Sequence, residues 1–242
     1  MPGKTIIILG SGPGIGTSVA SAFAVRGFTH VALVARNKER LAKDQDSVLD
    51  AIQERGYSCQ VKTWQCDLSD FTQLKQVLKE IESFGSVECV LFNAARVSGE
   101  SPLKETTDAI EADFRVSRLF NTGPKLTRQT TNLALYEVAQ WAIPLLKQNT
   151  GSPSLFVTST TQLYKEPHYD LFSLSMVKSA QRALVLSLNN KFGKDVHIAL
   201  LSIGGVVSPD AKNLSPENIA DKAWELYKQP KKDWQRECEI DE

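Results

Sequence analysis

Short apolar runs alternate along this chain with segments whose apolar residues recur at helical spacing. The runs predict buried strands at 6–9, 30–35, 59–64, 88–92, 154–160 and 197–203. The segments between them predict helices after residue 16, at about 38–55, 71–84 and 133–148, around Lys178 to Phe192, and after the N-cap Ser215. Regular strand–helix alternation is typical of an α/β fold with a doubly wound parallel sheet between two helical layers.

The first strand leads into a turn rich in glycine. Ile6–Leu9 is followed by Gly10-Ser11-Gly12-Pro13-Gly14-Ile15-Gly16 and then by a helical pattern. Backbone N–H groups at a helix N-terminus, with no Cβ in the way, form a site for a pyrophosphate. The turn therefore predicts nucleotide binding, and the alternative is a glycine-rich turn that holds no ligand.

The spacing of these glycines points to one family of nucleotide-binding proteins. Gly10-x-x-x-Gly14-x-Gly16 departs from G-x-G-x-x-G and resembles the signature of the short-chain dehydrogenase/reductase family of NAD(P)-dependent oxidoreductases. The resemblance runs from Lys4 to about Lys228 and implies a single Rossmann-type domain over residues 1–242. It implies homodimers or homotetramers packed through the helix at 133–148. It also implies that the turn holds the cofactor through Gly10, Ser11, Gly12, Gly14, Ile15 and Gly16.

The end of the second strand predicts which dinucleotide is preferred. A carboxylate here would accept hydrogen bonds from the 2′-hydroxyl of NAD and repel a 2′-phosphate. The chain has Ala35 and then Arg36, whose guanidinium can bind a phosphate with two N–H groups. Lys38 and Arg40 could assist, so we expect NADP(H) to be preferred over NAD(H). The alternative is that Arg36 is a solvated charge at a helix start.

Three further stretches resemble cofactor contacts of the family. Asp67-Leu68 resembles its adenine-binding element, Asn93-Ala94 is a partial match to N-N-A-G, and Gly204-Gly205-Val206 resembles P-G-x-V. The resemblance implies that Asp67 and Leu68 meet the adenine and that Gly204 and Val206 border the nicotinamide. Asn93 and Ala94 would line the cofactor, and the Asn93 amide could also tie neighbouring strands.

The resemblance is weak where catalysis is expected. The family uses Asn, Ser and Tyr-x-x-x-Lys, in which Tyr passes a proton to the developing alkoxide. Its Lys holds the nicotinamide ribose and lowers the Tyr pKa, so the resemblance gives Lys178 a cofactor-binding role as well. Lys178 is present, but Leu174 stands in the Tyr position. Thr160, beside Ser159, takes the place of Ser, and Thr131, beside Asn132, takes the place of Asn.

A leucine has no proton to donate, and two functions remain open. The chain could be an oxidoreductase of a small organic substrate, either an iminium that needs no proton or a carbonyl served by another acid. Replacement acids would come from the side chains of His168, Tyr164 or Tyr169. Alternatively, each of these three is a surface residue. The chain would then be an inactive family member that binds NADP(H) or another ligand as a sensor or partner protein.

Two segments depart from the family. Residues 117–130 form a polar, basic insertion, which we interpret as a surface loop, a disordered excursion or a translated intron, and expect to be poorly ordered. The polar tail at 229–242 lacks the family's final strand, so we expect it to fray or dock on a neighbour. Only Pro209 to Leu214 stands where the family has a helical lid, which predicts an open pocket.

Composition narrows the partners. The chain has 242 residues, of which 42% are hydrophobic, and its 28 basic and 28 acidic residues give a formal net charge of zero. Nothing in that balance favours a nucleic acid or an anionic membrane, so we expect a small-molecule substrate. With no apolar run of membrane-spanning length and no room for a signal peptide, we expect a cytoplasmic protein. Cys59, Cys66, Cys89 and Cys238 lack metal-site spacing, and we expect buried thiols and no metal.

Overall fold

The computed structural model describes residues 3–94 and 132–242. The predicted insertion at 117–130 and the candidate residue Thr131 therefore lie outside the described residues. Within them, one parallel sheet has the strand order β3-β2-β1-β4-β5-β6-β7. The strands are β1 (Lys4–Leu9), β2 (His30–Ala35), β3 (Gln60–Gln65), β4 (Ser86–Phe92), β5 (Ser154–Ser159), β6 (His197–Ile203) and β7 (Glu237–Ile240).

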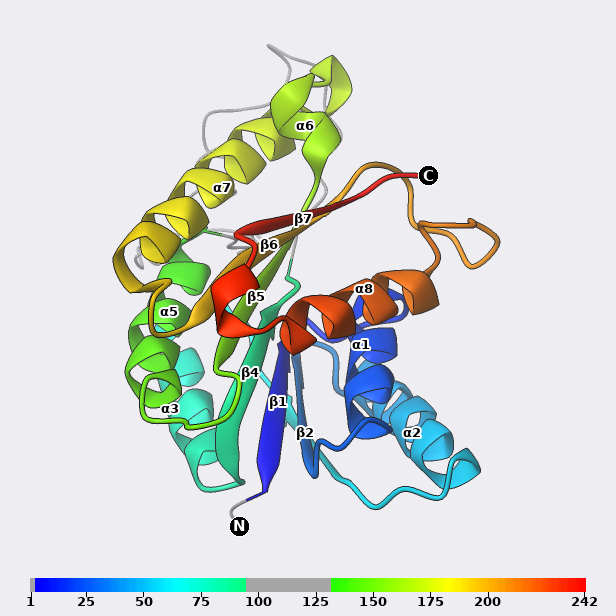
Figure 1. Cartoon of the computed structure of the whole chain (residues 1–242). Coiled ribbons are helices and arrows are strands. Elements are labelled where there is room, and N and C mark those ends of the chain that lie inside the picture. The colour runs from blue at the N-terminus through cyan, green and yellow to red at the C-terminus, as the bar shows by residue number, and fades with distance from the viewer. Residues whose placement is uncertain (1–2, 95–131) are drawn as a thin grey trace, which may run out of the picture.

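Helices cover both faces of this sheet, as Figure 1 shows. One layer holds α1 (Ile15–Ala24), α2 (Lys38–Glu54) and α8 (Pro216–Lys228). The other layer holds α3 (Phe71–Glu82), α5 (Asn132–Leu146) and α7 (Phe172–Phe192). The short elements are α6 (Thr161–Lys165), η1 (Tyr169–Leu171) and η2 (Lys231–Asp233). The predicted three-layer, doubly wound fold is therefore confirmed.

The alternation of side chains along β1 explains why there are two cores. Ile6 and Ile8 pack with α1, α2 and α8, whereas Ile7 and Leu9 pack on the α3, α5 and α7 side. All four are 0% exposed. A strand covered on both faces has no polar side, which is why this strand is an unbroken apolar run.

The tail contradicts its prediction. Glu237–Ile240 forms β7, which pairs in parallel with β6 and completes the sheet edge. Ile240 is buried in the core under α8, and Gly204 N–H donates to the Ile240 carbonyl at 2.8 Å. We expected this tail to fray because its residues are mostly polar, and among Glu237–Ile240 only Ile240 is an aliphatic hydrophobic. The expectation was wrong, because partners distant in sequence decide how these residues pair.

The other differences concern the ends of elements. β5 stops at Ser159, and Thr160 becomes the N-cap residue of α6. The segment that carries Tyr164, His168 and Tyr169 is partly helical, since α6 runs to Lys165 and η1 follows. Among the described residues, no helix has both the length and the apolar character needed to cross a bilayer.

Candidate functional site

The glycine turn between β1 and α1 has a shape that side chains would disturb. Gly10 and Gly14 have φ values of 94° and 95°, which L-residues with a side chain rarely adopt. A Cβ on Gly10 would lie 2.5 Å from the backbone nitrogen of Ala94. The turn therefore lies directly against the end of β4, next to Ala94.

The turn also presents N–H donors that have no acceptor among residues 3–94 and 132–242. The N–H groups of Gly12, Gly14, Ile15 and Gly16 bond to no group in the described part of the chain. They stand at the N-terminus of α1, where the helix dipole favours an anion. The residues thus fit the pyrophosphate of a dinucleotide, which this turn would hold.

Ser11 has a different position from the rest of the turn. Its N–H donates to the Val34 carbonyl at 3.0 Å, and its hydroxyl donates to Asp44 Oδ2 at 2.8 Å. Both donors are used inside the protein, so the contribution of Ser11 to a cofactor is the shape of the turn rather than a direct donor contact.

Asn93 ties three strands together at this end of the sheet. Its Nδ2 donates to the Gly10 carbonyl at 3.0 Å, and its Oδ1 accepts from Thr158 Oγ1 at 3.0 Å. Its N–H donates to the Leu9 carbonyl at 2.8 Å. The predicted bridging role of this amide is confirmed, and it fixes the glycine turn relative to β4 and β5.

Two basic residues, Arg36 and Arg40, lie just after β2 and differ in their partners. Arg36 directly follows the strand and is exposed, with its carbonyl accepting from Gln65 Nε2 at 3.0 Å. Its guanidinium has no ion pair among the described residues. Arg40, on the first turn of α2, donates from Nε to Asp44 Oδ1 at 3.0 Å.

Asp67 is held within its own turn. Its Oδ1 accepts from the Ser69 N–H at 2.9 Å and from the Ser69 hydroxyl at 2.7 Å. The helix cap of α3 is Asp70 instead. Leu68 is buried beside it. Asp67 therefore shapes the loop after β3, where the adenine contact is expected, and its carboxylate oxygen Oδ1 is already in use.

Lys178 is buried at the C-terminal ends of the central strands. Its Nζ donates to the Thr158 carbonyl at 3.1 Å and to Gln181 Oε1 at 2.9 Å, and the residue is 5% exposed. Burial lowers the pKa of this ammonium to about 8. With two of its three N–H donors used by these bonds, Lys178 can offer one to a ligand.

Several residues near Lys178, in sequence or in space, carry buried polar atoms that have no hydrogen-bond partner among the described residues. Ser159 Oγ, Asn132 Oδ1 and Gln181 Nε2 are buried and have no hydrogen-bond partner within the described part of the chain. Asn132 Nδ2 donates to the Val177 carbonyl at 3.1 Å, which places this residue beside α7. Buried polar atoms are seldom left unsatisfied, so these atoms indicate a place for a polar ligand or water.

The position one turn before Lys178 is apolar. Leu174 is 8% exposed and lies on the same face of α7 as Lys178. Thr160 is half-buried, and its side chain makes no capping bond to α6. The predicted residues Thr160, Ser159, Asn132 and Lys178 thus come from elements that meet at this end of the sheet.

Tyr164 is directed elsewhere. Its hydroxyl donates to Ser202 Oγ at 3.1 Å and also bonds to Glu237, and Arg182 stacks 5.0 Å from its ring centroid. Burial, together with the bond to Glu237, raises the pKa of this phenol to about 12. The expectation that Tyr164 serves as a replacement acid is therefore wrong, because its hydroxyl joins α6 to β6 and β7.

His168 and Tyr169 lie on the surface. They stack on each other with ring centroids 4.7 Å apart, and both are exposed. His168 Nδ1 accepts from the Asp170 N–H at 3.3 Å, capping η1. Their geometry agrees with the surface interpretation of these residues.

The loop after β6 borders the site and is held by the last residue of the sequence. Gly204 N–H is bonded to Ile240, whereas Val206 is 86% exposed. The Glu242 carboxylate accepts from the N–H groups of Lys212 at 2.8 Å, Asn213 at 3.2 Å and Leu214 at 3.0 Å. The short segment in the lid position is therefore fastened to the tail.

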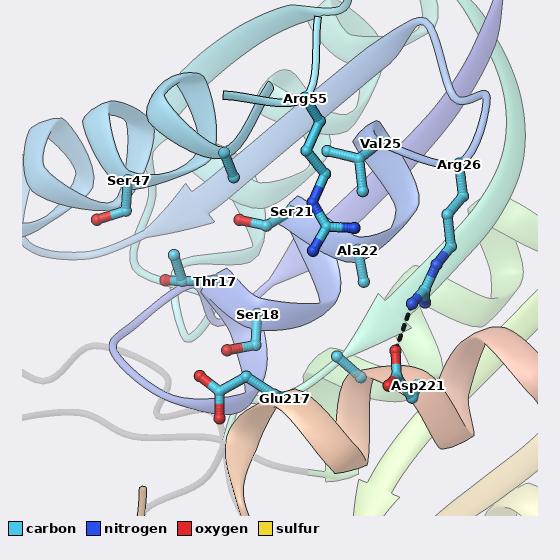
Figure 2. A pocket seen from close by; sticks show the side chains of 12 residues that line it. Thr17, Ser18, Ser21, Ala22, Val25, Arg26, Ser47, Arg55, Glu217 and Asp221 are labelled. Carbon is cyan, nitrogen blue, oxygen red and sulfur yellow. Dashed lines mark hydrogen bonds and ion pairs between the residues drawn. The ribbon is translucent and has the colours of Figure 1, made fainter. Parts of the chain in front are cut away.

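A pocket of about 350 Å³ lies elsewhere, between α1, α2 and α8 (Figure 2). Arg26 and Asp221 form an ion pair beside it, and Arg55 points into it from the end of α2. None of residues 10–16 lines this pocket. It is therefore separate from the glycine turn.

Sequence reasoning missed several residues of the site. Gln181 lies three residues after Lys178, so helical spacing alone could have indicated it. Thr158, Asp44 and Glu242 act through partners 20 or more residues away. No local pattern signals those pairings.

The profile of the family described as short chain dehydrogenase matches residues 4–219. An uncharacterized oxidoreductase of Thermotoga maritima is 28% identical over 205 residues, covering 84% of this chain and 70% of its own. A sepiapterin reductase of Chlorobaculum tepidum is 25% identical over 238 residues, covering 93% of this chain and 90% of its own.

A solved structure supports the same fold. A short chain oxidoreductase of Pseudomonas aeruginosa PAO1, bound to NADPH and described as containing an atypical catalytic center, superposes with a TM-score of 0.79 at 16% identity. The match covers 98% of this chain and 95% of that one. Because the family profile spans most of the sequence, from the first strand into the last long helix, the chain belongs to the short-chain dehydrogenase family of oxidoreductases.

Proposed function

We propose that this protein is an NADP(H)-dependent reductase of a small organic substrate whose reduction needs no phenolic acid, with an iminium carbon as the best-suited electrophile. The observation that carries the proposal is Lys178, which is buried and hydrogen-bonded among polar atoms that lack partners in the described part of the chain, with Leu174 one turn before it. This arrangement keeps a polar site while lacking a tyrosine in that position.

The cofactor preference rests on the residues after β2. Arg36 is exposed and free of ion pairs among the described residues, and Arg40 lies one helical turn on. Guanidinium groups suit a 2′-phosphate, and no carboxylate follows the strand. The P. aeruginosa oxidoreductase binds NADPH, and an alcohol dehydrogenase of Thermococcus sibiricus was solved with 5-hydroxy-NADP. Both supports are consistent with NADP(H).

The reaction asks little of the protein as an acid. The bound dinucleotide would supply a hydride, and its addition to an iminium carbon gives a neutral amine without any proton transfer. The chain's own part is to bind and orient: the turn N–H groups would hold the pyrophosphate and Lys178 the nicotinamide ribose. A carbonyl would instead need a proton, for which Lys178 is the buried titratable group at hand.

A second candidate function is favoured by Leu174. A family member without a phenol in this position could bind NADP(H) or another ligand as a sensor or partner protein, without turnover. Its support is that this apolar residue occurs in a chain whose glycine turn still offers N–H groups, free within the described residues, for a cofactor.

The test compares two substrates across pH. NADPH oxidation is followed with a permanently charged N-alkyl iminium, such as N-methyl-3,4-dihydroisoquinolinium, and with a panel of ketones and aldehydes. The ammonium form of Lys178 repels a cationic substrate, so iminium turnover should rise as the pH passes about 8. Carbonyl turnover that depends on Lys178 as acid should fall over the same range. NADPH binding without turnover of either class would overturn the reductase proposal and favour the sensor.

We also propose that the protein is cytoplasmic and assembles as a homodimer or homotetramer through α5. Leu133 and Tyr136 on that helix are 41% and 45% exposed, which supports a covered face in an oligomer. Light scattering coupled to size-exclusion chromatography tests this, and a monomer at micromolar concentration would contradict it.

A further inference from the structure

A buried carboxylate connects the glycine turn to the first turns of α2. Asp44 is 1% exposed, and it is one of the four buried residues of α2, with Leu41, Val48 and Ile52. These positions form the apolar stripe of the helix. An ionised group on such a stripe is costly unless it is paired, so its partners deserve an explanation.

Both carboxylate oxygens of Asp44 are used. Oδ2 accepts from the Ser11 hydroxyl at 2.8 Å, and Oδ1 accepts from Arg40 Nε at 3.0 Å. Ser11 belongs to the cofactor turn and Arg40 to the segment after β2. One side chain therefore joins the two parts of the protein that would flank the adenosine end of a dinucleotide.

The bond through Nε leaves the two terminal nitrogens of the Arg40 guanidinium available. Its terminal nitrogens have no hydrogen-bond partner among the described residues, and its side chain is 40% exposed. The Arg40 backbone is fixed as well, because its N–H donates to the Asn37 side chain at 2.8 Å. A guanidinium held at Nε presents a planar pair of N–H donors in one direction, which suits a phosphate.

We propose that Asp44 is a positioning residue for cofactor choice: it orients Arg40 toward the 2′-phosphate of NADP(H). This inference rests on the proposed NADP(H) dependence. It adds a residue that touches no part of the cofactor and still determines the preference for the phosphorylated form.

Charge alone predicts the opposite effect. The Asp44 carboxylate repels a phosphate, so removing its charge should tighten NADPH binding, by about twofold if the two charges interact across a screened distance of roughly 8 Å. Loss of the oriented guanidinium should weaken it more. In Asp44→Asn the new NH2 group also faces one of the two donors, Ser11 or Arg40, so one hydrogen bond is lost.

The experiment measures dissociation constants for NADPH and NADH by isothermal titration calorimetry. Asp44→Asn should weaken NADPH binding about tenfold and change NADH binding less than about twofold. The matched control is Asp46→Asn, which removes the same charge from an exposed position on the same helix and should leave both constants unchanged. Arg40→Lys keeps the net charge but loses the Nε donor, and it should shift the preference in the same direction as Asp44→Asn.

The outcomes separate the two claims. Equal weakening for both dinucleotides, or tighter NADPH binding, in Asp44→Asn would overturn the positioning role. If that variant does not fold, an unchanged preference in Arg40→Lys overturns it instead. If the wild-type protein binds NADH as tightly as NADPH, or binds neither, the proposed cofactor is overturned, and this inference with it.

Discussion

Lys178 is a cation that the fold holds away from water with neutral partners. Its hydrogen bonds go to the Thr158 carbonyl and to the Gln181 side chain. Neither carries a charge, so desolvation dominates and the pKa falls from 10.5 to about 8. The folded protein thus binds this proton less tightly than the unfolded chain does.

This shift predicts a stability change with pH. Between about pH 8 and 10.5 the unfolded chain holds the proton that the folded protein releases, so unfolding free energy from this group rises with pH. Lys178→Met should lack that rise and be more stable at pH 7, by up to about 3 kcal/mol. Urea unfolding at pH 7 and pH 10 measures both, and parallel pH profiles for the two proteins would contradict the shift.

Two glycines of the turn differ in what a methyl group would meet. Gly10 has a positive φ and would place a Cβ 2.5 Å from the backbone of Ala94, whereas a Cβ on Gly12 has nothing within 4 Å. Gly10→Ala should therefore lower unfolding free energy by at least about 2 kcal/mol, from backbone strain and the clash. Gly12→Ala should stay within about 0.5 kcal/mol of wild type. Thermal unfolding compares them, and similar melting temperatures for both variants would count against this geometry.

At the scale of elements, the tail and the loop after β6 form one unit. β7 pairs with β6, and Glu242 then reaches back to the N–H groups of residues 212–214. These hydrogen bonds lower the pKa of the Glu242 carboxyl, and the bond from the Lys212 N–H has the largest effect. The contact is therefore complete above the ordinary pKa of a glutamate and is lost as the pH falls through the lowered value.

Removing this carboxylate should loosen the loop without unfolding the sheet. Glu242→Ala is expected to speed amide hydrogen exchange at residues 212–214 and to leave the protection of β6 unchanged. Glu239→Ala serves as the control, since its carboxylate pairs with Lys165 and makes no bond to the loop. Exchange measured by mass spectrometry that is equal in the two variants would show that Glu242 does not hold the loop.

Elements with a strong local pattern were predictable, and those that depend on distant partners were not. The apolar run Ile6–Leu9 and the segment His197–Ile203 were both predicted as strands, and both form the sheet interior. Residues 237–240 carry two glutamates, and their place in the sheet depends on β6 and on Arg182, which pairs with Glu237 at 2.8 Å. Tyr164 likewise turned to Glu237, a partner 73 residues away.

The candidate site divides in the same way. The glycine positions could be placed from the strand–turn–helix pattern, and Lys178 from the resemblance of its surroundings to the family motif. The Ser11–Asp44–Arg40 connection could not, since Asp44 occupies a position on the apolar stripe of α2 and only the packed structure brings Ser11 to it.

At the scale of the whole molecule, the cofactor turn is fixed to the rest of the fold on both sides. Asn93 links β1, β4 and β5, and Asp44 links the turn to α2. A ligand held at this junction contacts parts of the chain that must all be folded. Its binding energy therefore adds to global stability.

NADPH should raise the melting temperature more than NADH does at equal concentration. At a hundredfold excess over its dissociation constant a ligand contributes about 2.7 kcal/mol, which for a chain of this size is roughly 5–10 °C. Differential scanning calorimetry measures the shift, with ATP at the same concentration as a control for polyphosphate binding. Equal shifts with NADPH and NADH would contradict the predicted preference.

The pairing of β1 has a consequence for how the chain reaches its native state. One edge of this central strand pairs with β2, which is nearby in sequence. The other edge pairs with β4, where Lys4 lies opposite Ser86, so this pairing requires a long loop to close. Until that long loop closes, β1 keeps a bare apolar edge on which a second unfinished chain can pair. The yield of refolding should therefore fall as the protein concentration rises, even under conditions in which the native protein is stable.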